Sequence, residues 1–235
     1  MVVMQCARLS NRIVKKLTER KSFIIISLLE WSERNSPLYP WRRDTTPYNI
    51  LISELLLRKT RADKVAEVYP LFLQQFPTIK HISDSSIDYL RKAIYTLGRL
   101  KRDEEIMNLA KKLAEKYSGN IPYSENDLFN IIGKQSRYTV NAIRCFAYGE
   151  RVPIFDVNVN RILSRVFTVN LGPQPHKNAN SWKLAQMLLP EKRIKEFNWA
   201  LLDLGRMICT SKPKCGICPL MTVCDYAKNK VISGE

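Results

Sequence analysis

Four cysteines near the C-terminal end have the side-chain type and the spacing to hold a metal centre. Gaps of five, two and five residues separate them. Thiolates are soft ligands, and four of them suit either a tetrahedral zinc ion or an iron–sulfur cube. Zinc sites usually combine two Cys-x2-Cys pairs, whereas this chain has one, which favours iron–sulfur and leaves zinc or disulfides open. The four are Cys209, Cys215, Cys218 and Cys224.

Two cations, Lys212 and Lys214, lie in the first gap between these cysteines. A metal-braced loop that displays cations is suited to contact phosphate groups. The whole chain is basic, because 38 Lys and Arg residues against 22 Asp and Glu give a formal net charge of +16. Such an excess favours a polyanionic partner, usually nucleic acid, although a merely lysine-rich surface has the same composition.

A single carboxylate, Glu54, lies in the segment 49–57, which is apolar on nearly every side. A helix that is apolar all round is buried, and a charge there is expensive unless it is paired or lines a cleft. Burial would raise the pKa of the carboxyl group towards the value that a general acid needs at neutral pH. The alternative is that Glu54 and Ser53 form the one exposed stripe, and periodicity does not decide between the two. Arg58 and Lys59 project from the end of this helix, where they could reach DNA.

A second carboxylate, Asp156, stands where an apolar stretch runs into a helix. Asp156 could simply cap that helix, with Asn158 as an alternative cap, and capping is the common role of such an aspartate. A carboxylate fixed at a joint between lobes can also face a cleft, where it could stabilise a cation or orient water. The local sequence favours the cap and leaves the catalytic role open.

The elements that must position these side chains are helical almost throughout. The chain has only 8 glycines among 235 residues, and alternating runs typical of strands are rare. Short joints containing proline and glycine predict compact bundled helices in two lobes divided by a cleft, with a hinge at 149–155. Helices are expected at 22–34, 47–58, 62–76, 87–97, 102–117, 125–132, 136–148, 158–167, 179–189 and 191–208.

The sequence contains no segment that would direct it into or across a membrane. No apolar run approaches the roughly 20 residues that span a bilayer, and no signal-peptide core follows the first basic residues. We therefore expect no membrane partner and a cytoplasmic, nucleoid-associated location. In that reducing compartment clustered cysteines more often bind metal than form disulfides.

Several motifs, in their order and separation, resemble the helix–hairpin–helix DNA glycosylases. This family includes endonuclease III, adenine DNA glycosylase and the archaeal-type thymine (G/T mismatch) glycosylase, and the resemblance covers about residues 22–228. The motifs are Pro40-Trp41-Arg42, Pro47-Tyr48, Ile52-Ser53-Glu54-Leu55-Leu56-Leu57-Arg58-Lys59-Thr60, Leu97-Gly98, Tyr138-Thr139, Asp156-x-Asn158-x-x-Arg161 and the four cysteines.

The resemblance implies an all-α fold of two helical lobes with a DNA-binding cleft between them. One lobe, 46–149, would be a six-helix barrel that contains the helix–hairpin–helix. The other would join 1–45 to 150–235 and carry a [4Fe–4S] cluster at about 209–224. The implied partner is double-stranded DNA with a mismatched or damaged base, which a monomer would flip into the cleft.

The family also implies roles for single residues. Asp156 would stabilise the positive charge that develops on the sugar, and Asn158 would support it. Glu54 matches the carboxylate that helps to activate the base or water in the adenine and mismatch enzymes. Lys59 falls where family members insert a side chain into the gap left by the flipped nucleotide.

Tyr138 bears on the type of reaction. Bifunctional members such as endonuclease III have a lysine here that attacks the sugar and forms a Schiff base, which leads to strand cleavage. Tyrosine cannot do this, so the resemblance implies a monofunctional enzyme that hydrolyses the N-glycosidic bond. Tyr138 followed by Thr139 resembles the thymine mismatch branch, and the chain ends soon after Cys224, without room for the further domain of the adenine branch.

Thymine or uracil opposite guanine is therefore the first hypothesis for the substrate. The alternatives are a glycosylase of the same fold that acts on adenine mispairs or oxidised pyrimidines, and a non-catalytic DNA-binding iron–sulfur protein.

The chain departs from the family pattern in two places. The hairpin that grips DNA usually reads Leu-Pro-Gly-Val-Gly, and its glycines let backbone N–H groups approach a phosphate closely. Here both glycines of the hairpin are replaced, so side-chain charge would have to compensate. The first cysteine gap is five residues instead of the usual six, so we expect the cluster in a tightened loop. The aligned hairpin is Ile132-Gly133-Lys134-Gln135-Ser136, followed by Arg137. The expected DNA contacts are Arg58, Lys59, Lys134, Gln135, Ser136, Arg137, Lys212 and Lys214.

Overall fold

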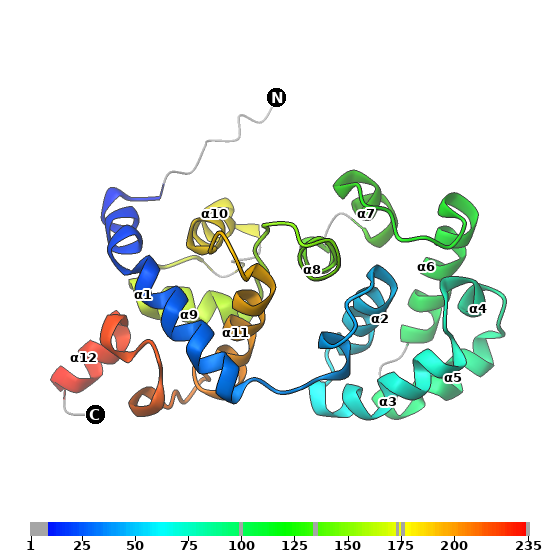
Figure 1. The fold of residues 1–235 in the computed structure, drawn as a ribbon, viewed down its shortest axis with the longest axis horizontal. Helices are drawn as coiled ribbons and strands as arrows, with labels where there is room; N and C mark the ends of the chain where they lie inside the picture. Colours follow the sequence, from blue (N-terminus) through cyan, green and yellow to red (C-terminus); the bar gives the residue numbers. More distant parts are fainter. Residues whose placement is uncertain (1–8, 99–100, 134–135, 173, 175–176, 234–235) are drawn as a thin grey trace. The chain divides into compact units, whose positions relative to one another are not determined.

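The computed structural model describes residues 9–98, 101–133, 136–172, 174 and 177–233. Every regular element in these stretches is a helix (Figure 1), which confirms the predicted all-α class. Within the same stretches, no helix has both the length and the apolar character needed to cross a bilayer.

The helices form two compact units. The central unit consists of Pro37–Glu150, and the terminal unit joins Met1–Ser36 to Arg151–Glu235. Residues 37–45, which we assigned to the terminal lobe from the sequence, pack on the central unit because Trp41 is buried there. The ring of Trp41 stacks on Tyr39, with centroids 4.6 Å apart, and meets Tyr69 edge-on at 5.6 Å.

Short connections join the helices of the central unit, shown from blue through cyan to green in Figure 1. The helices of this unit are η1 (Pro40–Arg42), α2 (Pro47–Leu57), α3 (Ala62–Gln75), α4 (Ile79–Ser83), α5 (Ile87–Ile94), η2 (Tyr95–Leu97), α6 (Arg102–Tyr117), α7 (Glu125–Ile132), α8 (Arg137–Ala142) and the π-helix η3 (Ile143–Ala147).

Helix α2 forms the core of the central unit. Every residue from Asn49 to Leu56 is buried, as expected of a helix that is apolar all round. Thr46 caps α2, because its Oγ1 accepts a hydrogen bond of 3.2 Å from the backbone N–H of Asn49, and Pro47 occupies the first turn. Helices α3, α8 and η3 pack against α2.

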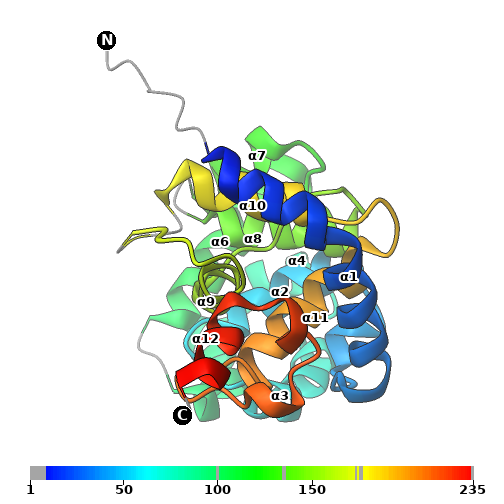
Figure 2. The same cartoon turned by 90° about the vertical axis from the view of Figure 1, so that its left-hand side faces the viewer.

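The terminal unit brings together segments from both ends of the chain. Helix α1 packs against α9, α10 and α11, and α12 packs against α9 (Figure 2). The unit buries an apolar core in which Leu28, Phe167 and Phe197 have no measurable exposure. Its elements are α1 (Asn11–Asn35), α9 (Val157–Phe167), α10 (Ala179–Leu188), α11 (Ile194–Met207), η5 (Cys215–Ile217), η6 (Met221–Val223) and α12 (Asp225–Ser233).

A few elements differ from those expected. Helix α1 begins at Asn11 instead of at residue 22, with Ser10 as its cap and with Ile13 and Leu17 continuing its buried face. The charged residues around these two hid the helical period. Helix α4 has 5 residues, too few to show a period, and neither α4 nor α12 was expected. The helix predicted at 136–148 ends in the π-helical turn η3.

Candidate active site and cysteine cluster

Three hydrogen bonds hold the carboxylate of Asp156 at the start of α9. Its Oδ1 accepts from the backbone N–H groups of Asn158 and Val159, each at 2.8 Å, and its Oδ2 accepts from Nδ2 of Asn158 at 2.7 Å. Asp156 is therefore the N-cap of α9, as the local sequence favoured. An ionised carboxylate has about four acceptor positions, so these three bonds leave it able to accept a further partner.

Asn158 and Arg161 connect this carboxylate to the first cysteine. Nη2 of Arg161 donates to Oδ1 of Asn158 at 2.7 Å and to the carbonyl oxygen of Gly205 at 2.8 Å. Nε of Arg161 donates to the carbonyl oxygen of Cys209 at 2.6 Å. A continuous series of hydrogen bonds thus joins Asp156, Asn158, Arg161 and Cys209, and it fixes the Asn158 amide with its N–H donor towards Asp156.

Gly205 lets α11 approach α9 at this point. A Cβ atom at Gly205 would stand 2.6 Å from Cβ of Asn158 and 3.4 Å from its backbone Cα and C atoms. Real Cβ contacts are not so short, so a side chain here would push Asn158 away. We did not single out Gly205 from the sequence, although an isolated glycine within a helical pattern is the signal that marks such positions.

Glu54 lies on α2 and is 7% exposed, and the neighbouring Ser53 is 1% exposed. The interpretation of these two residues as an exposed stripe is therefore wrong, and the carboxylate lies in the interior of the central unit. Glu54 and Tyr138 belong to the central unit, whereas Asp156 and Asn158 belong to the terminal unit. Helices α2 and α8, which carry Glu54 and Tyr138, pack against each other.

The segment before α8 corresponds to the expected hairpin. Lys134 and Gln135 lie outside the described residues. The backbone N–H of Ser136 donates to the carbonyl oxygen of Gly133 at 3.0 Å, and Gly133 has a φ of +105°, which proline cannot adopt. Arg137 is exposed, and Tyr138 is half-buried.

Arg58 caps the C-terminal end of α2, and Lys59 follows it. Arg58 is half-buried, and its Nη1 lies 3.5 Å from Oε2 of Glu105 on α6. Lys59 is exposed and has a φ of +56°. An exposed cation beside a half-buried one is consistent with the expected contact to DNA.

The four cysteines lie together at the edge of the core of the terminal unit. Cys224 is buried, the other three are half-buried, and all four are free thiols. Burial raises the pKa of Cys218 to about 11, a backbone hydrogen bond at Leu220 opposes the rise, and the charges of the other three cysteines add to it. No group of three or more His, Cys, Asp or Glu side chains in the described part of the chain is arranged to hold a metal ion.

Arg165 contacts the first cysteine directly. Its Nη1 donates to Sγ of Cys209 at 3.3 Å and to the carbonyl oxygen of Thr210 at 2.6 Å. The guanidinium carbon lies 4.8 Å from the ring centroid of Tyr226. Sequence reasoning missed Arg165, although its place four residues after Arg161 puts both on one face of a helix. Lys212 and Lys214 are exposed in the loop that follows Cys209.

Comparisons with known proteins match this architecture. Residues 52–186 match the family described as "HhH-GPD superfamily base excision DNA repair protein". A thymine-DNA glycosylase of Aeropyrum pernix is 37% identical over 195 residues, which cover 81% of this chain and 87% of that protein. A thymine/uracil-DNA glycosylase of Pyrobaculum aerophilum is 31% identical over 91% of this chain and 94% of its own length.

A solved structure has the same fold. The structure of a thermostable thymine-DNA glycosylase superposes with a TM-score of 0.83 and 28% identity, covering 90% of this chain and 98% of that one. The resemblance inferred from the motifs is thereby confirmed. The chain belongs to the HhH-GPD superfamily of base excision DNA repair proteins.

Proposed function

We propose that this protein is a monofunctional DNA glycosylase that hydrolyses the N-glycosidic bond of thymine or uracil paired with guanine in double-stranded DNA. Family membership and the two glycosylases that match over most of their length support the reaction and the bases. The structural observation that carries the proposal is the carboxylate of Asp156, fixed by three N–H donors.

Asp156 would act on the sugar. Breaking a glycosidic bond builds positive charge on the sugar ring in an oxocarbenium-like transition state. A carboxylate that is already oriented stabilises this charge without the free-energy cost of reorganising during the reaction. The Asn158 amide holds Oδ2, and the start of α9 holds Oδ1, so neither oxygen has to turn.

Glu54 would act on the base or on the attacking water. A carboxyl group in a water-poor interior can hold a proton and transfer it to the departing base, or take one from water. Helix α2 keeps Glu54 in the interior because nearly all of the buried residues around it on this helix are apolar.

Tyr138 supports the monofunctional part of the proposal. Strand cleavage by covalent catalysis requires an amine that forms a Schiff base with the opened sugar. Tyr138 carries a phenol, which forms no imine. The reaction would therefore end at the free base and an abasic site.

The four cysteines would hold a [4Fe–4S] cluster. They suit such a group because they are four free thiols within residues 209–224, and all four lie in or against the apolar core of the terminal unit. In a cube each thiolate binds a different iron, so the sulfur atoms stand farther apart than around a single ion. The cluster would supply a rigid brace for the loop that displays Lys212 and Lys214 to the DNA backbone.

The remaining expected contacts to DNA lie in the central unit, at the C-terminal end of α2 and in the hairpin before α8. Exposed Lys59 and Arg137 and half-buried Arg58 would neutralise phosphates or enter the duplex. The protein would act as a monomer at the chromosome, which places it in the cytoplasm with the nucleoid.

A panel of duplexes, each with one T, U, A or oxidised pyrimidine opposite guanine, tests the proposal. We expect wild type to release thymine and uracil and to leave abasic sites that break only in alkali. Asp156→Asn should lose release while keeping DNA binding, because asparagine also caps helices and removes only the charge. A wild type that leaves every duplex intact would refute the glycosylase, and release by Asp156→Asn at the wild-type rate would refute the role of the carboxylate.

A further inference from the structure

The turn that carries Lys59 has a backbone shape that lysine disfavours. The N–H of Thr60 donates to the carbonyl oxygen of Leu57 at 3.2 Å, which closes a four-residue turn. Arg58 has φ −58° and ψ 111°, and Lys59 has a φ of +56°. These angles are those of a type II turn, in which glycine or asparagine is preferred at the third position. Something outside the turn must therefore keep Lys59 in this conformation.

Arg102, at the start of α6, makes the contacts that can do so. It is 2% exposed. Its Nη2 donates to the carbonyl oxygen of Arg58 at 2.8 Å and to Oγ1 of Thr60 at 2.6 Å. The two acceptors flank Lys59 on either side. One guanidinium thus holds both residues next to Lys59 and does not depend on its side chain.

The bond to Arg58 selects the type of turn. Type I and type II turns differ mainly in the orientation of the central peptide group, whose carbonyl points to opposite sides of the turn. Here that carbonyl belongs to Arg58, and it points to a buried guanidinium. In a type I turn the same carbonyl would face away and lose the bond. The Arg102 guanidinium therefore stabilises the positive φ of Lys59.

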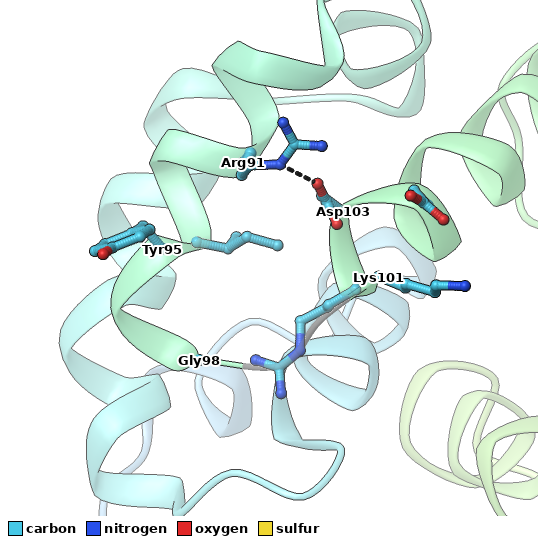
Figure 3. A pocket seen from close by; sticks show the side chains of 8 residues that line it. Arg91, Tyr95, Gly98, Lys101 and Asp103 are labelled. Carbon is cyan, nitrogen blue, oxygen red and sulfur yellow. Dashed lines mark hydrogen bonds and ion pairs between the residues drawn. The ribbon is translucent and has the colours of Figure 1, made fainter.

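The first turn of α6 is itself anchored. Nε of Arg91 on α5 donates to Oδ2 of Asp103 at 2.7 Å, and Figure 3 shows Arg91 pointing at Asp103 across the gap between the two helices. Glu105, two residues after Asp103 in the same turn, has its Oε2 3.5 Å from Nη1 of Arg58. Arg102 thus extends from a fixed base, and its reach to the turn does not vary freely.

From these contacts we infer that Arg102 is a positioning residue that sets the type II turn and thereby presents the Lys59 side chain to DNA. The inference rests on the proposed function, because it assigns Lys59 a place at the flipped nucleotide. Arg102 is 2% exposed, so we expect it to act through the turn that it holds and not by contact with the base or the sugar. Its loss should therefore reduce base release only as far as Lys59 contributes to it.

A double-mutant cycle with Arg102→Met and Lys59→Ala tests whether Arg102 affects base release through Lys59. We expect each single variant to slow single-turnover base release by about tenfold, the effect of losing one good charge-assisted contact. The double variant should be no slower than Lys59→Ala, because the two changes remove the same interaction. Losses that multiply in the double variant would overturn the inference. Arg102→Lys retains a buried donor, so its rate of base release should fall less than that of Arg102→Met. It replaces Arg102→Met in the cycle if Arg102→Met does not fold.

Amide hydrogen exchange tests whether Arg102 holds the turn, and this measurement does not require enzymatic activity. The Thr60 N–H closes the turn, so we expect it to exchange faster in Arg102→Met than in wild type. Arg91→Met is the matched control, because it removes an arginine contact to α6 but no contact to the turn. Because Arg91 anchors the first turn of α6 but does not touch the turn at Lys59, we expect Arg91→Met to speed Thr60 exchange less than Arg102→Met does, and an equal rise in the two variants would overturn the inference. Unchanged exchange in Arg102→Met would overturn the inference, whereas an inactive wild type with the expected exchange would refute only the proposed function.

Discussion

Asn158 donates a hydrogen bond of 2.7 Å to Oδ2 of Asp156 and accepts one of 2.7 Å from Arg161. The amide of Asn158 cannot flip without placing two acceptors, or two donors, face to face. Arg161 is fixed in turn by the carbonyl oxygens of Gly205 and Cys209. The orientation of the proposed catalytic carboxylate therefore depends on residues well beyond α9.

The first prediction concerns this amide. Asn158→Ala removes one of the three donors to Asp156 and leaves the guanidinium of Arg161 short of an acceptor. Hydrogen bonds to charged groups contribute about 1.5–3 kcal/mol, so we expect single-turnover base release to slow by roughly 10- to 100-fold. Affinity for an abasic-site duplex should change little, because the role proposed for Asn158 is to hold Asp156 in place and not to contact DNA.

Asn160→Ala is the matched control for Asn158→Ala. Asn160 lies on the same helix, but its side chain does not hold the carboxylate of Asp156; its backbone N–H donates to the carbonyl oxygen of that residue at 2.9 Å. Base release by Asn160→Ala should stay within a few-fold of wild type. Equal losses in the two variants would mean that the damage comes from α9 as a whole and not from the amide.

The second prediction concerns the close approach of α11 to α9. Gly205→Ala places a methyl group 2.6 Å from Cβ of Asn158, and overpacking of this kind typically costs about 1–3 kcal/mol. We expect a lower thermal midpoint and slower base release, because Asn158 has to move. Gly216→Ala is the control, since a Cβ there meets nothing within 4 Å, and its midpoint should match that of wild type.

The elements that the sequence predicted well have strong local signals. Helices α6 and α7 begin and end at the predicted residues because acidic residues fill their first turns, and Ser124 caps α7. For Glu54 the sequence left burial and exposure open, because its apolar neighbours did not show which face of the helix is covered, and the structure shows that it is buried. The first half of helix α1 was missed because the residues around Ile13 and Leu17 are mostly charged. The sequence does not show that α1 packs against helices far along the chain, which buries these two side chains.

The supporting residues of the site could not be predicted because their roles depend on tertiary contacts. Gly205 matters only because α9 passes within contact distance. Arg102 matters only because its guanidinium reaches a turn 42 residues earlier in the chain. The groups of the proposed site, such as the cysteines and Asp156, could be singled out from the sequence by their side-chain type, their spacing and the family motifs that contain them.

The third prediction concerns the cysteine cluster. Cys218→Ser should abolish the broad visible absorbance of a [4Fe–4S] protein and lower the stability of the loop around it, because a hydroxyl is a poor substitute for a thiolate. Cys145→Ala is the control. Cys145 is fully buried in the central unit, so its variant should lose stability but keep the absorbance. A colourless wild type with stoichiometric zinc would refute the iron–sulfur assignment.

The fourth prediction concerns Tyr138. An amine at this position should attack the sugar and form a Schiff base, so we expect Tyr138→Lys to become covalently trapped on a substrate duplex when borohydride is added. Wild type should show no trapped complex under the same conditions. Arg137→Lys is the matched control, because it places an amine on the same helix one residue earlier, about 100° around the axis. Trapping by both variants would show that any nearby lysine suffices, and trapping by neither would contradict the place of Tyr138 beside the sugar.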